Sequence, residues 1–316
     1  MARILVTGGA GYIGSTAAAM LADLNHEVIV FDDLSTGHQS SVDPRAEFIE
    51  GSLLDPDALR RALVGVSAVV HFAGKSLVGE SVTKPELYHH VNVDGTRNLI
   101  DAMKLYAIDK LVFSSSAATY GSTSVTPITE DIAGTPTNPY GQSKLDIDHL
   151  ISASHLSAIS LRYFNVAGAH KSASGWLAER HDPETHLIPN VIKATAAKPL
   201  HIFGTDWPTP DGTCIRDYVH VVDLIDAHIK ALHSLKHGQH EIINLGSGSG
   251  YSVKDVVSSA ERVLARPVPV IESERRAGDP ATLVASIEKA QTILGWQPTK
   301  SLDEMIRDTQ LALNLV

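Results

Sequence analysis

The first half of the chain alternates short apolar runs with longer amphipathic segments. The apolar runs cover residues 3–8, 27–33, 67–74, 109–116 and 158–165, and each ends in small or polar residues. Helical patterns follow at residues 13–24, at 88–106 and from Tyr140 onward. Strands that alternate with helices predict a parallel sheet covered on both faces. The expected fold class is therefore α/β, a doubly wound parallel sheet that binds ligands at the carboxyl ends of its strands.

The pattern changes after about Gly168. Loops lengthen, and Pro, Gly and His become frequent, as in residues 204–220. We therefore expect two units: a dinucleotide-binding domain over residues 1–168 and a smaller α/β substrate-binding region over residues 169–316. Residues 218–232 have the pattern of a helix, and we expect a helix near 218–235 to pack back onto the first domain.

Composition and charge narrow the class of protein. The chain has 316 residues, 43% hydrophobic and 20% charged, which is ordinary for a globular protein. A net charge of -10 argues against nucleic-acid binding. Cys214 is the only cysteine, so a disulfide framework is excluded and a reducing compartment is favoured. No apolar run reaches the roughly 18 residues of a membrane span, and the first apolar run is too short for a signal peptide. We expect a cytoplasmic location and no membrane partner.

A glycine-rich turn predicts a dinucleotide site. Gly8, Gly11 and Gly14 lie between the first strand and the first helix, where glycine allows backbone N–H groups to approach a pyrophosphate. The second strand ends at Asp32 and Asp33, where an acid accepts hydrogen bonds from an adenosine ribose and repels a 2'-phosphate. The pattern therefore predicts a Rossmann domain that binds NAD rather than NADP.

A second group of residues predicts hydride-transfer chemistry. One strand ends in three serines, the last of them Ser116, and the next helix begins with Tyr140 and Lys144 one turn apart. In a doubly wound sheet this strand end and helix start can face one crevice. An ammonium near a phenol lowers the pKa of the phenol. Tyr140 is therefore the candidate base, and Lys144 is the residue that lowers its pKa. Ser116 is the candidate for orienting the substrate hydroxyl.

Several stretches now resemble a known family. GGAGYIGS at residues 8–15, NPYGQSK at 138–144, RYFNVAGAH at 162–170 and DGTCIRDYVHV at 211–221 resemble the UDP-galactose/UDP-glucose 4-epimerases. These enzymes are extended short-chain dehydrogenase/reductases, and the resemblance covers essentially the whole chain. The first two stretches specify only the superfamily, whereas the last two point to the epimerases. The resemblance implies homodimers that form through a bundle of the helices at 88–106 and after Tyr140.

The resemblance also implies a mechanism. Tyr140, with Ser116, would remove the proton of the sugar 4-hydroxyl while hydride passes from C4 to tightly bound NAD+. The 4-keto sugar would swing about its diphosphate, and hydride would return to its other face. The implied cofactor contacts are Gly8, Gly11, Tyr12, Ile13, Gly14, Asp32, Asp33, Ser52, Leu53, Phe72, Ala73, Gly74, Asn92 and Lys144. The implied substrate contacts are Ser116, Tyr140, Phe164, Asn165, His186, Leu187, Phe203, Arg216, Arg276 and Asp279. Guanidinium forks suit a diphosphate, which fits the two arginines.

The chain departs from the family pattern at four positions. After HFAG a lysine comes one residue on, at Lys75, whereas many members have it at the place of Ser76. Ser52 stands where an acid is common, and His186 stands where some members have asparagine. Leu283 occupies the position that limits sugar size in the family, so acceptance of N-acetylated sugars stays open.

Four other functions share some of these sequence features. UDP-N-acetylglucosamine 4-epimerase, or an epimerase of both sugars, is the nearest. Sugar 4,6-dehydratases need acids after the serine, where this chain has Ala117 and Ala118. A non-catalytic NAD-sensing protein is the distant alternative, since fold does not fix function. A metal enzyme is suggested only by the 16 histidines, which form no ligand motif, and no metal is expected.

Overall fold

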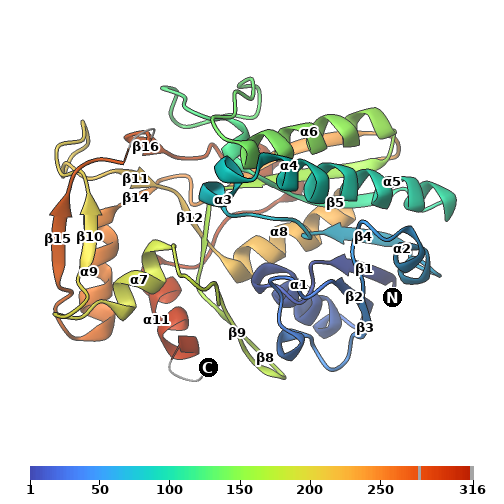
Figure 1. Cartoon of the computed structure of the whole chain (residues 1–316), viewed down its shortest axis with the longest axis horizontal. Helices are drawn as coiled ribbons and strands as arrows, with labels where there is room; N and C mark the ends of the chain where they lie inside the picture. The colour runs from blue at the N-terminus through green and yellow to red at the C-terminus, as the bar shows by residue number, and fades with distance from the viewer. Residues whose placement is uncertain (277–278, 314–316) are drawn as a thin grey trace.

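Seven parallel strands form the main sheet of the computed structural model, which describes residues 1–276 and 279–313 (Figure 1). The strand order is β13-β6-β5-β4-β1-β2-β3, and it reverses between β1 and β4, where a crevice opens at the carboxyl ends. The predicted fold class is confirmed. The strands are β1 (Arg3–Thr7), β2 (Glu27–Asp32), β3 (Glu47–Glu50), β4 (Ala68–His71), β5 (Lys110–Ser116), β6 (Ser157–Tyr163) and β13 (His240–Leu245).

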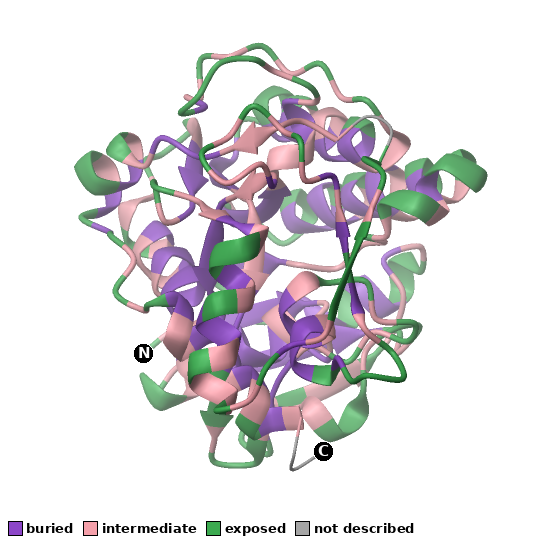
Figure 2. Cartoon of the chain, turned by 90° about the vertical axis from the view of Figure 1, so that its left-hand side faces the viewer, coloured by how far each residue is buried: buried purple, intermediate pink, exposed green. Residues whose placement is uncertain are grey.

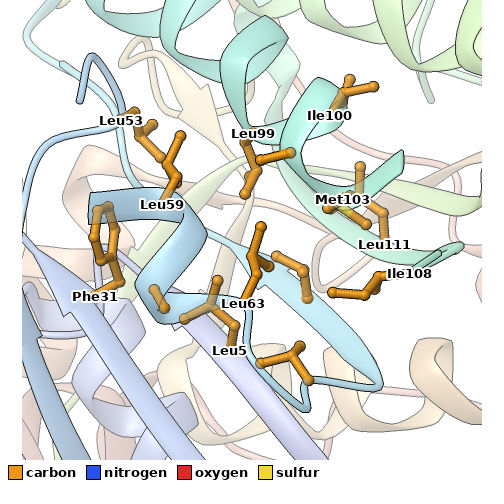
Figure 3. Packing of buried hydrophobic residues seen from close by; sticks show 14 of the residues in the cluster. Leu5, Phe31, Leu53, Leu59, Leu63, Leu99, Ile100, Met103, Ile108 and Leu111 are labelled. Atoms are coloured by element: carbon orange, nitrogen blue, oxygen red, sulfur yellow. The ribbon is translucent and has the colours of Figure 1, made fainter. Parts of the chain in front are cut away.

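Helices cover both faces of this sheet because its strands are apolar on both faces. In β1, Leu5 packs into one core and Val6 into the other, as the alternation of side chains along a strand requires. Leu5 belongs to the same core as Leu59, Leu99 and Met103 (Figure 3). The helices on the Leu5 side are α2 (Pro56–Ala62), α5 (Gly95–Leu105) and α6 (Pro139–Ser154). Those on the Val6 side are α1 (Tyr12–Asp23), α8 (Val221–Ser234) and α10 (Glu288–Leu294).

Three of these elements come from the second half of the chain. α8 and α10 pack on the Val6 face, and Trp296, which is 1% exposed, is buried in the same core. Residues 240–245 were assigned by sequence to the smaller region, but they form β13 and pair with β6 at the edge of the main sheet. The apolar residues Ile243 and Leu245 are buried there, which explains why the strand joins the larger core.

The smaller region has its own core beyond the strand ends. Val191, Ile202, Val256 and Met305 are buried together in it. Its elements are α7 (Leu187–Lys193), β10 (Leu200–Phe203), β11 (Ile215–Arg216), β14 (Tyr251–Ser252), α9 (Val253–Leu264), β15 (Val270–Ser273), β16 (Thr282–Leu283) and α11 (Leu302–Leu313). Figure 2 shows the buried strands and inner helix faces against the exposed outer helix faces.

Short segments connect the two cores. β7 (Asn165–Ala167) pairs in parallel with β12 (Tyr218–His220), and β8 (His170–Ser172) forms a hairpin with β9 (Gly175–Leu177). The remaining elements are η1 (Gln39–Ser41), α3 (Val78–Thr83), α4 (Pro85–Tyr88), η2 (His89–Asp94) and η3 (Ala117–Thr119). Across the described ranges, no helix combines the length and apolar character that a membrane crossing requires.

Candidate active site

The turn after β1 can be formed only by glycine at two of its positions. Gly8 has φ +70°, and a Cβ there would lie 2.6 Å from the backbone nitrogen of Ala73 after β4. A Cβ on Gly14 would lie 2.1 Å from the carbonyl oxygen of Gly8. A Cβ on Gly11 would meet only that same oxygen, at 3.4 Å. The first strand can therefore turn sharply into α1, and Gly11 is less crowded than Gly8 and Gly14.

The start of α1 presents free backbone N–H groups. Its N-cap is Gly11, no side chain in the described part of the protein caps it, and its first turn carries no acid. An uncapped helix start with a positive dipole end is a binding site for phosphate groups. The carboxylate of Asp32 lies beside it and accepts hydrogen bonds from the backbone N–H of Ala10 at 3.0 Å and of Leu34 at 2.8 Å. Burial raises the pKa of Asp32, and these two hydrogen bonds oppose the rise.

The predicted cofactor residues line one cavity of about 840 Å³, with a single exception. Asn92 does not line it but lies behind its wall, where Oδ1 accepts a hydrogen bond from the backbone N–H of Lys75 at 2.7 Å and Nδ2 donates to the Lys75 carbonyl at 3.0 Å. Asn92 therefore fixes the chain after β4. The residues that do line the cavity are Gly8, Gly11, Tyr12, Ile13, Gly14, Asp32, Asp33, Ser52, Leu53, Phe72, Ala73, Gly74 and Lys144, together with Lys75 and Ser76.

The reactive residues meet in the same cavity because α6 begins against η3. The side chain of Asn138 accepts a hydrogen bond from the Gly141 backbone N–H at 2.9 Å and caps the helix, and Pro139 occupies its first turn. A Cβ on Gly141 would lie 2.4 Å from the carbonyl of Ala118, so this turn packs directly on the backbone after β5. Ser116, Tyr140 and Lys144 all line the cavity as a result.

The charges around Tyr140 differ from the sequence expectation. Desolvation raises the pKa of Tyr140, and a hydrogen bond with Ser116 opposes the rise. The Nζ of Lys144 lies 6.0 Å from the centre of the Tyr140 ring and donates to the carbonyl of Ser114 at 2.8 Å. The sequence analysis expected Lys144 to lower this pKa; in this structure the net shift is upward, and the ammonium is directed to the carbonyl of Ser114 in β5. Burial lowers the pKa of Lys144 itself to about 8, with Asp148 acting in the opposite direction.

A second cavity of about 450 Å³ adjoins the first and shares several lining residues with it. The guanidinium of Arg276 lies 3.9 Å from the centre of the Phe203 ring. Arg216 donates to the carbonyls of Ile215 and Pro280, both at 2.9 Å, and lies 3.6 Å from the carboxylate of Asp279. The predicted substrate residues in this cavity are Asn165, His186, Leu187, Phe203, Arg216, Arg276 and Asp279, whereas Phe164 lines the larger cavity.

Leu283 lies apart from both cavities. It is half-buried in β16 and pairs with Arg216 of β11, and it is not among the lining residues of either cavity. Ala277 and Gly278, within the stretch RRAGDPA, lie outside the described residues.

A charged cluster that the sequence did not predict lies at the wall shared by the two cavities. Nδ1 of His181 lies 2.5 Å from the carboxylate of Glu179, and Nδ1 of His186 lies 2.8 Å from that of Glu184. The adjacent carboxylate of Glu179 raises the pKa of His181. Burial lowers the pKa of His186, but the carboxylates outweigh it and the net shift is upward. The spacing matches no familiar motif, and only the fold of residues 179–186 brings the four side chains together.

This cluster also contains metal-ligand residue types. Atoms of Glu179, His181 and His186 lie within 4.8 Å of one another. Each imidazole already faces a carboxylate, so two ion pairs account for the arrangement.

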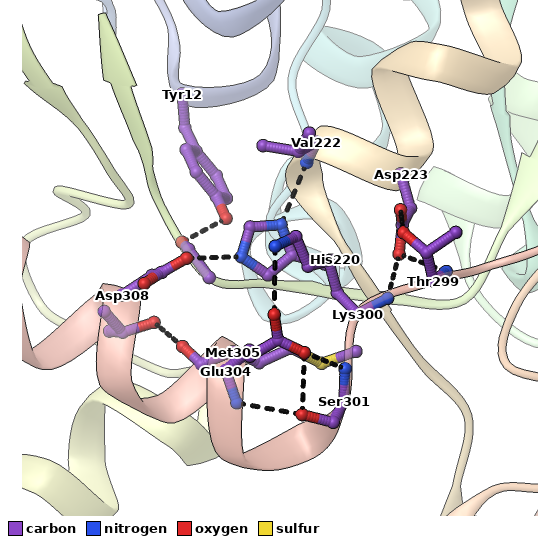
Figure 4. A network of polar contacts seen from close by, with 12 residues as sticks. Tyr12, His220, Val222, Asp223, Thr299, Lys300, Ser301, Glu304, Met305 and Asp308 are labelled. Atoms are coloured by element: carbon purple, nitrogen blue, oxygen red, sulfur yellow. Dashed lines mark hydrogen bonds and ion pairs between the residues drawn. The ribbon is translucent and has the colours of Figure 1, made fainter.

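A polar network ties the cofactor turn to the smaller region (Figure 4). Tyr12, at the start of α1, donates its hydroxyl to the carbonyl of Gly168 at 2.6 Å. His220 packs against Gly168, accepts a hydrogen bond from the Val222 backbone N–H at 3.1 Å, and lies 3.2 Å from Asp308 of α11. Tyr12, predicted to contact the cofactor, lines the larger cavity, while its hydroxyl is bound to the backbone between β7 and β8.

A comparison with protein-family models now identifies the family. The model described as the NAD dependent epimerase/dehydratase family matches residues 4–246. The chain belongs to this family.

Relatives in this epimerase/dehydratase family align along nearly the whole chain. A UDP-glucose 4-epimerase of Corynebacterium glutamicum is 51% identical over 302 residues, which cover 94% of this chain and 91% of that protein. The crystal structure of UDP-glucose 4-epimerase from Brucella ovis in complex with NAD is 44% identical, with a TM-score of 0.93 and 98% coverage of both chains. That from Bifidobacterium longum, in complex with NAD+ and UDP, is 34% identical, with a TM-score of 0.90 and coverage of 99% and 98%. The resemblance seen in the sequence is confirmed.

The residues present fit the NAD of this family. Gly11 of the glycine turn lines the cavity without a side chain, the start of α1 is uncapped, and Asp32 retains lone pairs that can accept ribose hydrogen bonds. A pyrophosphate and an adenosine ribose have matching partners in this part of the cavity.

Proposed function

We propose that this protein interconverts UDP-galactose and UDP-glucose at C4 of the sugar, with NAD held throughout the cycle. One observation carries the proposal: Ser116, Tyr140 and Lys144 line the cavity of the cofactor turn, and the arginine-bearing cavity adjoins it. The relatives are named UDP-glucose 4-epimerases, and one of their structures holds NAD+ and UDP. When bound, NAD supplies the hydride acceptor and donor.

The side chains of the two cavities would transfer the proton and position the sugar. Ser116 and Tyr140 hold the 4-hydroxyl, and the Tyr140 oxygen accepts its proton and later returns it. A tyrosine with a raised pKa stays protonated and cannot accept a proton, so its environment must favour the phenolate when the substrate reacts. The Lys144 ammonium and the positive nicotinamide ring both act in that direction. Arg216 and Arg276 would grip the diphosphate while the sugar turns between its two faces.

The larger organisation belongs to the same proposal. Residues 1–168 with α8 would hold NAD, and residues 169–316 would supply most contacts to the nucleotide sugar. α5 and α6 lie side by side on one face of the sheet and present a helical surface for a homodimer (Figure 1). A chain with a single cysteine suits the reducing cytoplasm, where we place the enzyme.

Proton NMR of the sugar tests the reaction directly. Purified protein given UDP-galactose without added NAD is expected to form UDP-glucose until the two reach equilibrium. Conversion of UDP-N-acetylgalactosamine in a parallel sample would extend the activity to N-acetylated sugars. Bound NAD without conversion of either would contradict the epimerase proposal and favour an NAD-sensing protein.

The Tyr140→Phe variant tests the proposed base. It should retain the fold and NAD but lose about 10²- to 10⁴-fold in turnover, the contribution typical of general acid–base catalysis. Tyr106→Phe removes an exposed hydroxyl at the end of α5 and serves as the matched control. Near-normal turnover by Tyr140→Phe would rule out Tyr140 as the base.

A further inference from the structure

Asp148 is a buried carboxylate that the proposed reaction does not use. It lies one helical turn after Lys144 in α6, and the two residues are 1% and 5% exposed. Residues four apart on a helix lie on the same face, with Cβ atoms about 5–6 Å apart. A buried acid is costly unless it is paired, so its partners show what it stabilises.

The partners of Asp148 all bind one of its two oxygens. Arg162 of β6 donates to Oδ2 through Nε at 3.0 Å and through Nη2 at 2.8 Å. Ser115 of β5 donates to the same oxygen at 3.2 Å. Oδ1 is buried and has no hydrogen-bond partner among the residues that the structure describes. The carboxylate is thus fixed by Arg162, but half of it is left without a hydrogen bond.

Lys144 has few groups that could stabilise its charge. Its Nζ donates to the Ser114 carbonyl and lies 4.7 Å from the centre of the Phe113 ring. The titratable or charged groups near it come from three elements: His71 of β4, Arg162 and Tyr163 of β6, and Tyr140 and Asp148 of α6. Burial lowers the pKa of His71 to about 3, with Lys144 adding to the shift, so this imidazole is neutral. Both tyrosines have raised pKa values through desolvation. Asp148 is therefore the one anion in this set of neighbours.

We propose that Asp148 is a positioning residue that keeps Lys144 in its ammonium form, so that the charge is available to Tyr140 at neutral and mildly alkaline pH. Arg162 holds the carboxylate in place through one oxygen, and the charge of Asp148 partly offsets the effect of burial on Lys144. The inference rests on the proposed function for its consequence in catalysis, but the charge state of Lys144 can be measured independently.

The test uses a double variant, because removing Asp148 alone would leave the buried Arg162 without its carboxylate partner. In Asp148→Asn with Arg162→Gln, both charges disappear and the side-chain volumes stay similar. Protein labelled with ε-13C-lysine is titrated by NMR, and the Lys144 signal is assigned by its loss in Lys144→Met. We expect the Lys144 midpoint to fall by about one pH unit, the shift that one nearby charge typically produces. The alkaline limb of kcat/KM should move down equally, with little change at pH 6.5.

Asp146→Asn is the matched control, because it removes a half-exposed carboxylate from the same helix. It should leave the Lys144 midpoint and the alkaline limb unchanged. An unchanged midpoint in a folded double variant would overturn the inference. So would a uniform loss of activity at every pH, which would indicate a purely structural role. If the wild-type protein does not epimerise UDP-galactose, the proposed function fails, while the NMR titration still decides the role of Asp148.

Discussion

Different kinds of chemical group line the two adjoining cavities. The cofactor side is made largely of backbone, since three glycines in one turn and an uncapped helix start shape it. The nucleotide-sugar side is made of side chains from separate elements: Arg216 from β11, Phe203 from β10, and Arg276 and His186 from loops or their borders with helices. One side is fixed by local geometry, and the other is assembled by the tertiary fold.

This difference predicts how each side responds to change. A binding site formed by closely packed backbone atoms has little room for an added atom, so one added methyl group can abolish binding. A site made of exposed or half-buried side chains can lose one of them while the fold remains, and the loss appears in affinity. Substitutions on the cofactor side should therefore cause loss of bound NAD. Substitutions on the nucleotide side should raise KM for UDP-galactose and leave the bound NAD in place.

The largest effect is expected from Gly14→Ala. Its Cβ would lie 2.1 Å from the Gly8 carbonyl, so the turn must open and the start of α1 must move. We expect the purified variant to retain less than about a tenth of the wild-type NAD, measured by absorbance after acid release. A loss of about 1–3 kcal/mol in the free energy of unfolding should accompany it.

Gly79→Ala is the matched control for this change. Gly79 also lines the cofactor cavity, but a Cβ there would meet no atom within 4 Å. This variant should keep its NAD and its stability. Full NAD retention by Gly14→Ala would show that the turn tolerates side chains and would break the proposed contrast between the two sides.

The same contrast explains what the sequence could predict. Gly8, Gly11 and Gly14 could be placed because a tight turn between strand and helix requires glycine at fixed spacing. Tyr140 and Ser116 could be brought together because the order of strands and helices sets which ends meet at the crevice. Arg216 and Arg276 could not be placed from physical reasoning, since nothing local distinguishes them from surface charges, and only the family resemblance located them.

Other features required the three-dimensional arrangement. β13 lies at the sheet edge because of its burial against β6, which its local sequence does not specify. The direction of the pKa shift at Tyr140 follows from its burial, and the Lys144 ammonium is directed to the Ser114 carbonyl; neither is visible in the local sequence. The Glu179–His186 cluster depends on the path of one loop.

A smaller effect is expected from Arg276→Ala on the nucleotide side. A guanidinium that grips a diphosphate typically contributes about 1.5–3 kcal/mol, so KM for UDP-galactose should rise about 10- to 100-fold. NAD content and the unfolding midpoint should stay at wild-type values. Initial-rate kinetics over a range of UDP-galactose concentrations measure the change.

Arg275→Ala provides a neighbouring control. Its guanidinium lies 4.2 Å from the centre of the Trp207 ring and pairs with Asp206 at 2.7 Å, and Arg275 lines neither cavity. KM should therefore change less than about threefold. Equal effects from both arginines would mean that general surface charge, rather than a specific contact, attracts the nucleotide.

The smallest effect is expected from pH, acting through His186 at the wall between the two cavities. Its pKa is raised by the carboxylates of Glu184 and Glu179, which outweigh burial. A histidine with a raised pKa is cationic below its ordinary pKa of about 6.5 and loses this charge as pH rises through the raised value. UDP should therefore bind more weakly at pH 8.5 than at pH 6.5.

The size of this effect follows from exposure. The His186 side chain is 43% exposed, so solvent screens its charge and the change in the Kd of UDP should be only about three- to tenfold. Calorimetric titration of UDP across this pH range measures it. His186→Asn keeps a hydrogen-bonding side chain without the charge, and the titration of UDP itself is the same for both proteins. If the Kd of UDP depends on pH equally steeply in the variant, another group causes the pH dependence. A flatter profile would show that His186, and not only the two arginines, contributes charge to the nucleotide side.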